Sequence, residues 1–469
     1  MPSVIVASKF SADIEIDCLI IGAGAAGLTA ALAASESGAS VLVAEREIRL
    51  SGSTALSSGL IPAAGTKAQD HQSIRDSEDI FYTDIMAKNK NTVDPAYVKL
   101  IVRKIPKTLD WLADNYRIPF HVLDNFLYPG HTNFRMHSVP EQTGFGLINR
   151  LEVAVSANDI TIATGVQVTD IVVDNSDKAL GAICLRPDGS SEKIAAASII
   201  MACNGYGANP DLIAEYIPEM KDALYFGHPG NQGEAVLWGK ALGAELTHLS
   251  GYQGHGSVAH PHGILVTWAL MMEGGIQINT DGVRFSNEHS GYSEQAVSVL
   301  RQTGQIAFNI FDERLVSLGR GFDDFNKAED SGAIIKAKDK SDLAQKLGVN
   351  LSALGETLTD CARYAEGNGI DPFGRGFDPT KLLTPPYYAI KVTGALFHTQ
   401  GGLTINHLTQ ICRPDGSQFD NIFACGGAAC GVSGPDVSGY LSGNGLLTAL
   451  SLGEIAGHSA GKYVNSGIM

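Results

Sequence analysis

The 469-residue sequence is poor in charge, in paired cysteines and in basic clusters. Charged residues make up 18% of the chain, and 34 Lys and Arg are outnumbered by 50 Asp and Glu, which gives a net charge of −16. No block of like charges offsets this acidic balance, so a nucleic acid partner is not expected. The seven cysteines are scattered and never spaced C-x-x-C. This pattern indicates reduced thiols rather than a disulfide framework.

The sequence also lacks a long apolar run and a cluster of metal ligands. The first 15 residues have no apolar core of the length that a signal peptide needs. We therefore expect a cytoplasmic protein without a membrane span. His260 and His262 have no third ligand at a sensible spacing, so no metal site is expected.

Glycine, in contrast, is abundant, with 53 residues and no G-X-Y period. Three of these glycines form Gly22-Ala-Gly24-Ala-Ala-Gly27 between a predicted strand at 16–21 and an Ala-rich helix reaching 37. A second strand at 40–44 leads to Glu45, 18 residues beyond Gly27. In such a βαβ unit the glycines permit a tight turn, close approach of a pyrophosphate and helix packing, while the acid binds a ribose hydroxyl. The segment predicts dinucleotide binding.

The remaining pattern places the dinucleotide fold at both chain ends. We expect antiparallel strands over 160–183 with turns at Gly165, Asp170 and Asn175, then a strand at 194–203. Near the C-terminus a strand at 421–425 precedes Gly426-Gly427, and a final helix runs over 446–462. Between these parts lies an insertion with a strand pair at 275–278 and 283–285 and helical stretches over 338–365.

Several motifs together resemble the flavoprotein family that includes fumarate reductase, the succinate dehydrogenase flavoprotein subunit and the 3-ketosteroid dehydrogenases. They are the glycine motif with Glu45, Gln253-Gly-His255, Gly282-Val-Arg-Phe-Ser-Asn-Glu288, Asp371-Pro-Phe-Gly-Arg375, His398-Thr-Gln-Gly-Gly402 and Ser442-Gly-Asn444. The resemblance covers nearly the whole chain. It implies an α/β fold: a Rossmann-like FAD-binding domain built from residues 1–249 and 389–469, with an inserted α+β capping domain at 250–388 and substrate bound between them.

FAD is the cofactor that the glycine motif and the resemblance predict. Polar turns at 51–54 and 57–59 are of the kind that wraps an isoalloxazine or ribityl chain, and 48–59 lacks the His through which covalent members attach flavin. We therefore expect non-covalent FAD. The predicted cofactor-binding residues are Gly22, Gly24, Ala26, Gly27, Glu45, Arg46, Ser53, Thr54, Ser58, Gly59, Val168, Asn204, Gly205, Gly427, Gly443, Asn444, Leu446 and Leu447.

The catalytic positions of the family are only partly matched. His255 and His398 fit the two histidines with which fumarate reductases hold substrate oxygens, although Gly256 replaces the usual Pro. Tyr292 stands where those enzymes have a proton-donating Arg, and Tyr440 where a second Arg holds substrate carboxylate. Trp268 and Met271 replace the Glu and Arg of the proton path. These are uncharged positions, and reduction of a dicarboxylate needs cations.

The tyrosines resemble those of the ketosteroid dehydrogenases, which implies an FAD-dependent dehydrogenase that introduces a C=C bond α,β to a ketone carbonyl. Tyr292 would be the base and Tyr440 the donor to the enolate oxygen, with Tyr128 as a helper. A cyclic ketone, carboxylated or not, or a 3-ketosteroid is the expected substrate. Oxygen, a quinone or another molecule would accept the electrons. The plain alternative is that these tyrosines and histidines are packing or turn residues with satisfied polar groups.

Two other functions stay open. One is a reductase of an unsaturated acid, using His255 and His398 with an Arg from elsewhere, such as Arg135 or Arg314. The other is a non-catalytic flavin-binding electron-transfer module. Arg135 lies with His131 and His137 on a Gly/Pro-flanked loop. It is either solvated there or a partner for a carboxylate on the substrate.

Overall fold

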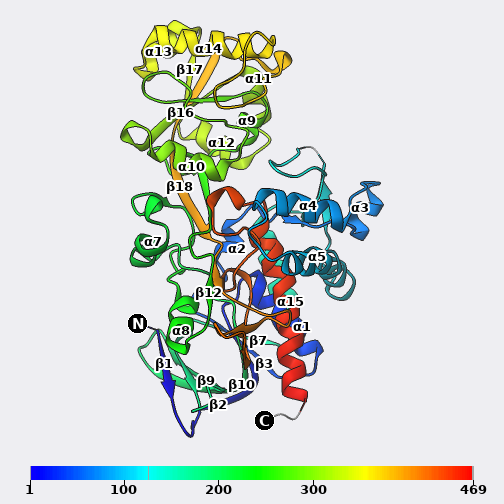
Figure 1. Cartoon of the computed structure of the whole chain (residues 1–469). Coiled ribbons are helices and arrows are strands. Elements are labelled where there is room, and N and C mark those ends of the chain that lie inside the picture. Colours follow the sequence, from blue (N-terminus) through cyan, green and yellow to red (C-terminus); the bar gives the residue numbers. More distant parts are fainter. Residues whose placement is uncertain (1, 125, 467–469) are drawn as a thin grey trace. The chain divides into compact units, whose positions relative to one another are not determined.

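The computed structural model describes residues 2–124 and 126–466 (Figure 1). By their internal contacts these residues fall into two compact units. Of the described residues, the first unit comprises 2–124, 126–217, 227–252 and 398–466, and the second Pro218–Phe226 and Gln253–Phe397.

The first unit is organised around one large sheet. Its strands lie in the order β1 (Ser3–Val6), β8 (Gln167–Val173), β9 (Ala179–Leu185), β10 (Ser191–Met201), β2 (Ile14–Ile21), β3 (Val41–Glu45) and β7 (Thr161–Thr164). From the C-terminal part, β21 (Gln418–Ala424) pairs in parallel with β10 and antiparallel with β20 (Gln410–Cys412). Strands β21, β10, β2, β3 and β7 are parallel to one another, and since β21 comes from the C-terminal part, both parts of the chain form the dinucleotide-type sheet.

Two helices from opposite ends of the sequence pack against each other in this unit, α1 (Ala25–Glu36) and α15 (Asn444–Asn465) (Figure 1). Glycines of α15 allow the close approach: a Cβ at Gly453 would lie 2.5 Å from the carbonyl oxygen of Ala26, and one at Gly457 2.2 Å from that of Ala30. Larger residues cannot stand there, because buried atoms already touch. The predicted α/β fold built from both chain ends is confirmed.

Shorter elements complete the first unit. They are α2 (Ser53–Leu56), α3 (Lys67–His71), α4 (Glu78–Lys88), α5 (Pro95–Tyr116), α6 (Gly144–Ser156), α7 (Pro210–Tyr216), α8 (Glu234–Leu242), the small sheets β4 (Ile61–Pro62), β6 (Met136–Ser138), β5 (His121–Leu123) and β12 (Leu246–Thr247), β19 (Gly402–Leu403), and the 3-10 turns η4 (Gly426–Ala428) and η5 (Val437–Gly439).

The second unit has its own sheet, centred on the long strand β18 (Tyr387–Thr399). Its order is β14 (Ile264–Leu265), β13 (Tyr252–Ala259), β18, β16 (Ile306–Asp312) and β15 (Ile276–Ile278), while β11 (Leu224–Tyr225) and β17 (Ile334–Ala337) also pair with β18. Its helices are α9 (Ala269–Met272), α10 (Tyr292–Leu300), α11 (Glu313–Gly319), α12 (Asp323–Asp330), α13 (Lys340–Leu347) and α14 (Leu351–Ala365), with η1 (Pro218–Met220), η2 (Thr303–Gln305) and η3 (Pro379–Lys381).

The contact units change at 252/253 and 397/398, whereas the sequence placed the domain boundaries at 249/250 and 388/389. The second offset arises because β18 runs without a break from Tyr387 to Thr399. In addition, Pro218–Phe226 belongs to the second unit, because β11 pairs with residues 395–396 of β18.

Two local predictions were wrong. Residues 283–285 form no strand, and β15 pairs with β16 instead. Arg284 is drawn into a buried ion network with Glu288 and Asp371, which holds this segment as a loop. Asp170 lies inside β8 rather than in a turn, since β8 continues to Val173 and pairs with β9.

Among the described residues, no helix combines the length and the apolar character needed to cross a bilayer.

Candidate active site

The turn between β2 and α1 has the steric properties that a pyrophosphate site needs. Gly22 has φ +105°, and a Cβ at Gly27 would lie 1.9 Å from the carbonyl oxygen of Gly22, so both must be glycine for the turn to fold. Gly24 differs, because a Cβ there would meet only Thr54 Oγ1, at 3.6 Å. The protein itself tolerates a side chain at this position. The space in front of Gly24 therefore fits a ligand that approaches the backbone closely.

The N-terminus of α1 is available to an anion. The backbone N–H of Ala25 donates to Thr54 Oγ1 (3.0 Å), whereas the N-cap residue Gly24 has no side chain that could cap the helix. At the end of β3, Glu45 accepts hydrogen bonds from the backbone N–H of Ala23 (2.8 Å) and of Glu47 (2.9 Å). This helix N-terminus, with its positive dipole, fits phosphate, and the anchored carboxylate fits a ribose hydroxyl.

Polar residues from three separated segments gather around Ser53. Its Oγ accepts from Asn204 Nδ2 (2.7 Å) and from Asn231 Nδ2 (2.9 Å). Asn204 has φ +66° and forms a tight turn with Gly205. The backbone N–H of Gly205 donates to Asn204 Oδ1 (2.8 Å). Gly427 lies against the same amide, since a Cβ there would be 2.1 Å from Asn204 Oδ1. The structure thus brings together four residues that the sequence predicted singly.

A pair next to this cluster was not predicted in full. Arg46 forms a salt bridge with Glu234 (3.0 Å), and Glu234 Oε2 is buried without a hydrogen-bond partner among the described residues. Glu234 and Asn231 flank the turn that opens α8. The Gly230-Asn-Gln-Gly-Glu234 sequence before an apolar helix was the available signal for them.

Other predicted cofactor residues have different placements. Gly59 has φ +67° and packs on the backbone of Thr143, so its glycine is required by packing within the protein. Ser58 is exposed, and Val168 is buried in β8 opposite Cys184.

The N-terminus of α15 offers a second set of groups. Gly443 precedes it with φ +86°, and no side chain caps this helix in the described chain. Asn444 is fully buried and donates from Nδ2 to Ser433 Oγ (2.9 Å). Its Oδ1 has no hydrogen-bond partner among the described residues. A buried amide oxygen without a partner is costly, so it fits an N–H of a bound flavin ring. Leu446 and Leu447 follow in the first turn of the helix.

His398 and Tyr440 form a pair beside this helix end. Their rings meet edge to face at 5.6 Å between centroids, and a Cβ at Gly445 would lie 3.0 Å from His398 Cε1. Desolvation lowers the pKa of His398 to about 4, so the ring is neutral at physiological pH. Tyr440 is buried. The pair places two polar side chains next to the predicted flavin site.

His255 and Tyr292 form the corresponding pair of the second unit. Their rings stack at 4.8 Å, and Trp268 and Phe397 enclose His255 at 5.8 and 5.5 Å. His255 Nδ1 accepts from the backbone N–H of Ser257 (3.2 Å), which leaves the proton of the neutral ring on Nε2. Burial lowers the pKa of His255 to about 3. Tyr292 begins α10, directly after Gly291 with φ +142°.

Tyr128 lies in the first unit, on the loop after β5. It is half-buried, its ring meets Phe126 edge to face at 4.9 Å, and burial raises its pKa to about 12. The loop packs beside Tyr440: His131 Nε2 donates to the Ser442 carbonyl oxygen (3.0 Å), and Gly130 lies against Leu441.

Arg135 was expected either to be solvated or to bind a carboxylate on the substrate. The side chain is fully buried, donates to Asp76 (2.9 Å) and Asp84 (2.7 Å), and lies 4.6 Å over the ring of Phe81. The loop is therefore not solvated at this point. The guanidinium is held by two carboxylates, so the structure lends no support to the predicted role of Arg135 in binding a carboxylate on the substrate. Arg314, the other candidate of the rival function, is exposed on α11.

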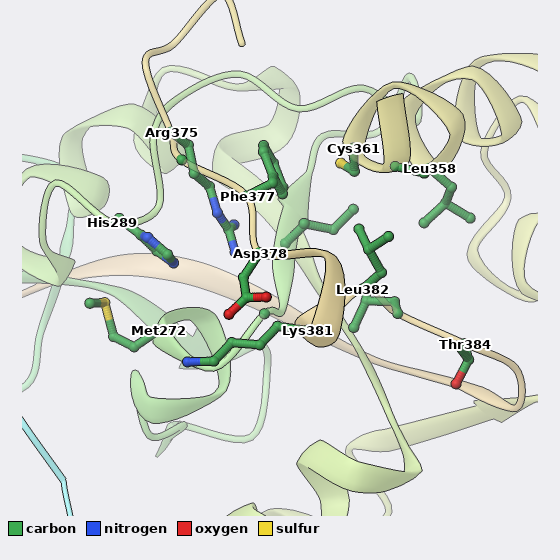
Figure 2. Close-up of a pocket in the computed structure, with 15 residues that line it drawn as sticks. Met272, His289, Leu358, Cys361, Arg375, Phe377, Asp378, Lys381, Leu382 and Thr384 are labelled. Atoms are coloured by element: carbon green, nitrogen blue, oxygen red, sulfur yellow. The ribbon is translucent and has the colours of Figure 1, made fainter. Parts of the chain in front are cut away.

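The second unit also contains a cavity of about 300 Å³, around which Arg375, His289 and Lys381 are arranged (Figure 2). Their charges are compensated within the protein. Arg375 pairs with Glu288 (3.0 Å) and Lys381 with Glu273 (2.8 Å), while desolvation lowers the pKa of His289 to about 4. This cavity does not bring together any of the predicted catalytic residues.

Comparison with known proteins agrees with this geometry. The model of the family described as "FAD binding domain" matches residues 17–446. The probable fumarate reductase Ifc3 of Shewanella frigidimarina is 29% identical over 451 residues, which cover 95% of this chain and 74% of that protein. A solved structure of the open conformation of a flavocytochrome c3 fumarate reductase is 28% identical, with a TM-score of 0.81, over 97% of this chain and 79% of the other.

A ketosteroid dehydrogenase shares the fold as well. The 3-ketosteroid-Δ4-(5α)-dehydrogenase of Rhodococcus jostii, solved with 4-androstene-3,17-dione, has a TM-score of 0.78 over 98% of this chain and all of its own, at 21% identity. The βαβ turn, the two glycine-preceded helix N-termini and these matches define an FAD-dependent oxidoreductase. The chain belongs to the FAD binding domain family, and FAD is its cofactor.

Proposed function

We propose that the protein is an FAD-dependent dehydrogenase acting on CH–CH groups, which introduces a C=C bond α,β to the carbonyl of a cyclic ketone or 3-ketosteroid. The observation that carries this proposal is the chemical nature of two positions. Where a dicarboxylate reductase needs cations, this chain has Tyr292 and Tyr440, each paired with a histidine that is neutral because of its burial. Neutral donors suit a ketone oxygen, and a phenol suits abstraction of a weakly acidic α-proton.

In this reaction the phenolate of Tyr292 removes the proton from the α-carbon, and the ring of His255 stacked on it fixes its orientation. The hydroxyl of Tyr440 and a ring N–H of His398 donate hydrogen bonds to the carbonyl oxygen, on which negative charge develops. Bound FAD supplies the acceptor for the hydride that leaves the β-carbon. Trp268 and Phe397 pack around His255 and keep water from the proton-transfer groups.

Reoxidation of the flavin requires a further acceptor, which is oxygen, a quinone or another molecule. All seven cysteines are free, which supports a reducing compartment such as the cytoplasm.

A reductase of an unsaturated acid is the second candidate, favoured by the 29% identity with the probable fumarate reductase. Against it stands the burial of Arg135 between Asp76 and Asp84, because the reductase needs a cation for the substrate carboxylate.

The test is the direction in which substrates change the flavin spectrum under anaerobic conditions. Cyclic ketones or steroid ketones should bleach the oxidised flavin, and succinate should not. The rival function predicts the reverse: fumarate or another unsaturated acid reoxidises chemically reduced enzyme, while no ketone bleaches it.

A further inference from the structure

A buried chain of hydrogen bonds leads from the N-terminus of α15 to His398. It passes from Asn444 through Ser433 to Gln400 and ends at His398, and the first three of these side chains are each at most 6% exposed. The only part of it that the sequence pointed to was its two ends. The middle members have no role in the proposed reaction as described above.

The direction of each hydrogen bond follows from the chemistry of the groups. Asn444 Nδ2 only donates, so Ser433 Oγ is the acceptor of that hydrogen bond (2.9 Å). The Ser433 hydroxyl in turn donates a hydrogen bond to Gln400 Oε1 (2.6 Å). The amide nitrogen of Gln400 then faces His398 Nδ1 at 2.8 Å. The orientation of such an amide is assigned from its network, and here a further contact favours the one described. The Thr399 carbonyl oxygen lies 3.5 Å from the same end of Gln400, and a carbonyl accepts only from the nitrogen end.

A donor at 2.8 Å requires that His398 Nδ1 carries no proton. We propose that Gln400 is a positioning residue, which with Ser433 holds His398 in the Nε2–H tautomer and makes it a neutral hydrogen-bond donor to the substrate oxygen. The neutral ring must then carry its hydrogen on Nε2, the side of the ring away from the network. This inference rests on the proposed function for the substrate, but the tautomer itself does not depend on it.

At its other end, the series of hydrogen bonds begins at Asn444, whose amide oxygen can accept a hydrogen bond from the bound cofactor. Asn444 Oδ1 is buried and has no partner in the described chain, while Nδ2 is committed to Ser433. If an N–H of the bound flavin ring donates to Oδ1, it holds the Asn444 amide in this orientation. The direction of every following hydrogen bond, from Asn444 to His398, depends on that orientation. FAD binding should therefore strengthen the tautomer preference of His398.

The competing arrangement is the reverse direction, with His398 Nδ1–H donating. Its available acceptors would be Thr399 O at 3.3 Å and a flipped Gln400 amide. The two arrangements give opposite protonation of the two ring nitrogens, so one measurement separates them.

The experiment is 15N NMR of the FAD-loaded protein labelled at histidine, with the His398 signals identified by their loss in His398→Gln. We expect an unprotonated, pyridine-type Nδ1 and a protonated Nε2. Gln400→Glu replaces the donor with a carboxylate that only accepts, so Nδ1 should gain a proton. Gln418→Glu, an equivalent change at an exposed position of β21, should leave the signals of His398 unchanged.

The kinetic arm follows reduction of the flavin by a ketone that bleaches the wild-type enzyme. Gln400→Glu should slow the reduction step by about 10²–10³, the loss typical of one oxyanion donor, with little change in substrate binding. Gln418→Glu should match wild type. Ser433→Ala, which frees the Gln400 amide to rotate, should give a second, smaller slowing together with partial protonation of Nδ1.

An Nδ1–H tautomer in the wild type would overturn the inference, and so would a Gln400→Glu variant that keeps Nδ1 unprotonated or reduces flavin as fast as Gln418→Glu. If no ketone bleaches the flavin, the proposed function fails. The NMR result is independent of that outcome, since no substrate is present.

Discussion

At the scale of single residues, the two tyrosines are distinguished by the groups beside them. Tyr292 stacks face to face on His255, whereas Tyr440 meets His398 edge to face. The stack on His255 fixes the plane of the Tyr292 ring, and a phenol held in a defined orientation suits the role of general base. The Tyr440 pair instead adjoins polar side chains, which suits donation to a developing negative charge.

We expect Tyr292→Phe to abolish reduction of the flavin by ketone while FAD stays bound. Phe keeps the ring stacked on His255 and removes only the hydroxyl. Loss of a general base typically lowers the rate by about 10²–10⁴. Stopped-flow reduction measures it, with the flavin absorbance as the check on cofactor content. A rate within about threefold of wild type, far short of a general-base loss, would exclude Tyr292 as the base.

Tyr440→Phe should slow ketone turnover by roughly 10²–10³, because one preorganised donor to the enolate oxygen is lost. Binding of a phenol-like product should weaken as well. The matched variant is Tyr440→Arg, which places a cation at the position: it should raise activity on fumarate only if the rival reductase function holds. Undiminished ketone turnover in Tyr440→Phe would count against the assignment of Tyr440.

Residue types could be predicted from the sequence, but their pairings could not. Arg135 illustrates the limit: its partners Asp76 and Asp84 lie more than fifty residues away in sequence, and nothing local marks the three as one buried group. Gln400 and Ser433 escaped notice for the same reason. Their importance follows from hydrogen bonds that form only when the residue after β18, the loop before η5 and the first residue of α15 meet.

At the scale of elements, the β2–α1 turn was the most predictable part, because its function depends on backbone space that only glycine provides. The hairpin expected at 275–285 failed because a turn at Gly282 is compatible with both a hairpin and a loop. Long-range ion pairs of Arg284 decided between them.

The turn yields a matched pair of variants. Gly24→Ala should fold normally, since its Cβ would be 3.6 Å from Thr54 Oγ1, but should weaken FAD binding by tenfold or more because the methyl occupies the ligand's space. Gly27→Ala places a methyl 1.9 Å from the Gly22 carbonyl oxygen, so it should lower the thermal midpoint of the apoprotein itself. Flavin titration and thermal unfolding of both apoproteins check this. Equal FAD affinity in Gly24→Ala and wild type would argue against the phosphate site.

The segment after β3 predicts how FAD is held. Residues 48–59 contain no histidine, the residue through which covalent members of the resembled family attach flavin. We expect FAD to appear in the supernatant after acid precipitation, measured by its absorbance. Yellow pellet with colourless supernatant would indicate a covalent bond.

At the scale of the whole molecule, each of the two units is organised around one large sheet. Each unit also contains buried histidines. The first unit is closed by its own C-terminal helix, because α15 covers α1 and β21 extends the sheet. Separation into ends and insertion could be predicted, since each part has its own strand pattern. The boundary residues could not, because β18 continues from one unit into the other.

The buried histidines predict how stability depends on pH. Burial lowers the pKa of His131 and His255 to about 3 and of His137, His289 and His398 to about 4. In the unfolded chain the same groups have a pKa near ~6.5. As pH falls below that value the unfolded state binds protons that the folded state does not, so the free energy of unfolding decreases. Each such histidine contributes roughly 1.4 kcal/mol per pH unit between the two pKa values.

The free energy of unfolding of the apoprotein in urea should therefore be nearly independent of pH from 8 to 7. It should decrease steeply from about pH 6.5 to 5, a window above the range in which carboxylates titrate. His289→Gln, which can still donate to the Met271 carbonyl oxygen, should reduce that slope by one proton relative to the wild type. A slope that is flat through this window, or equal in the wild type and the variant, would mean that these histidines titrate in the folded state and are not held neutral, as the proposed mechanism requires of His255 and His398.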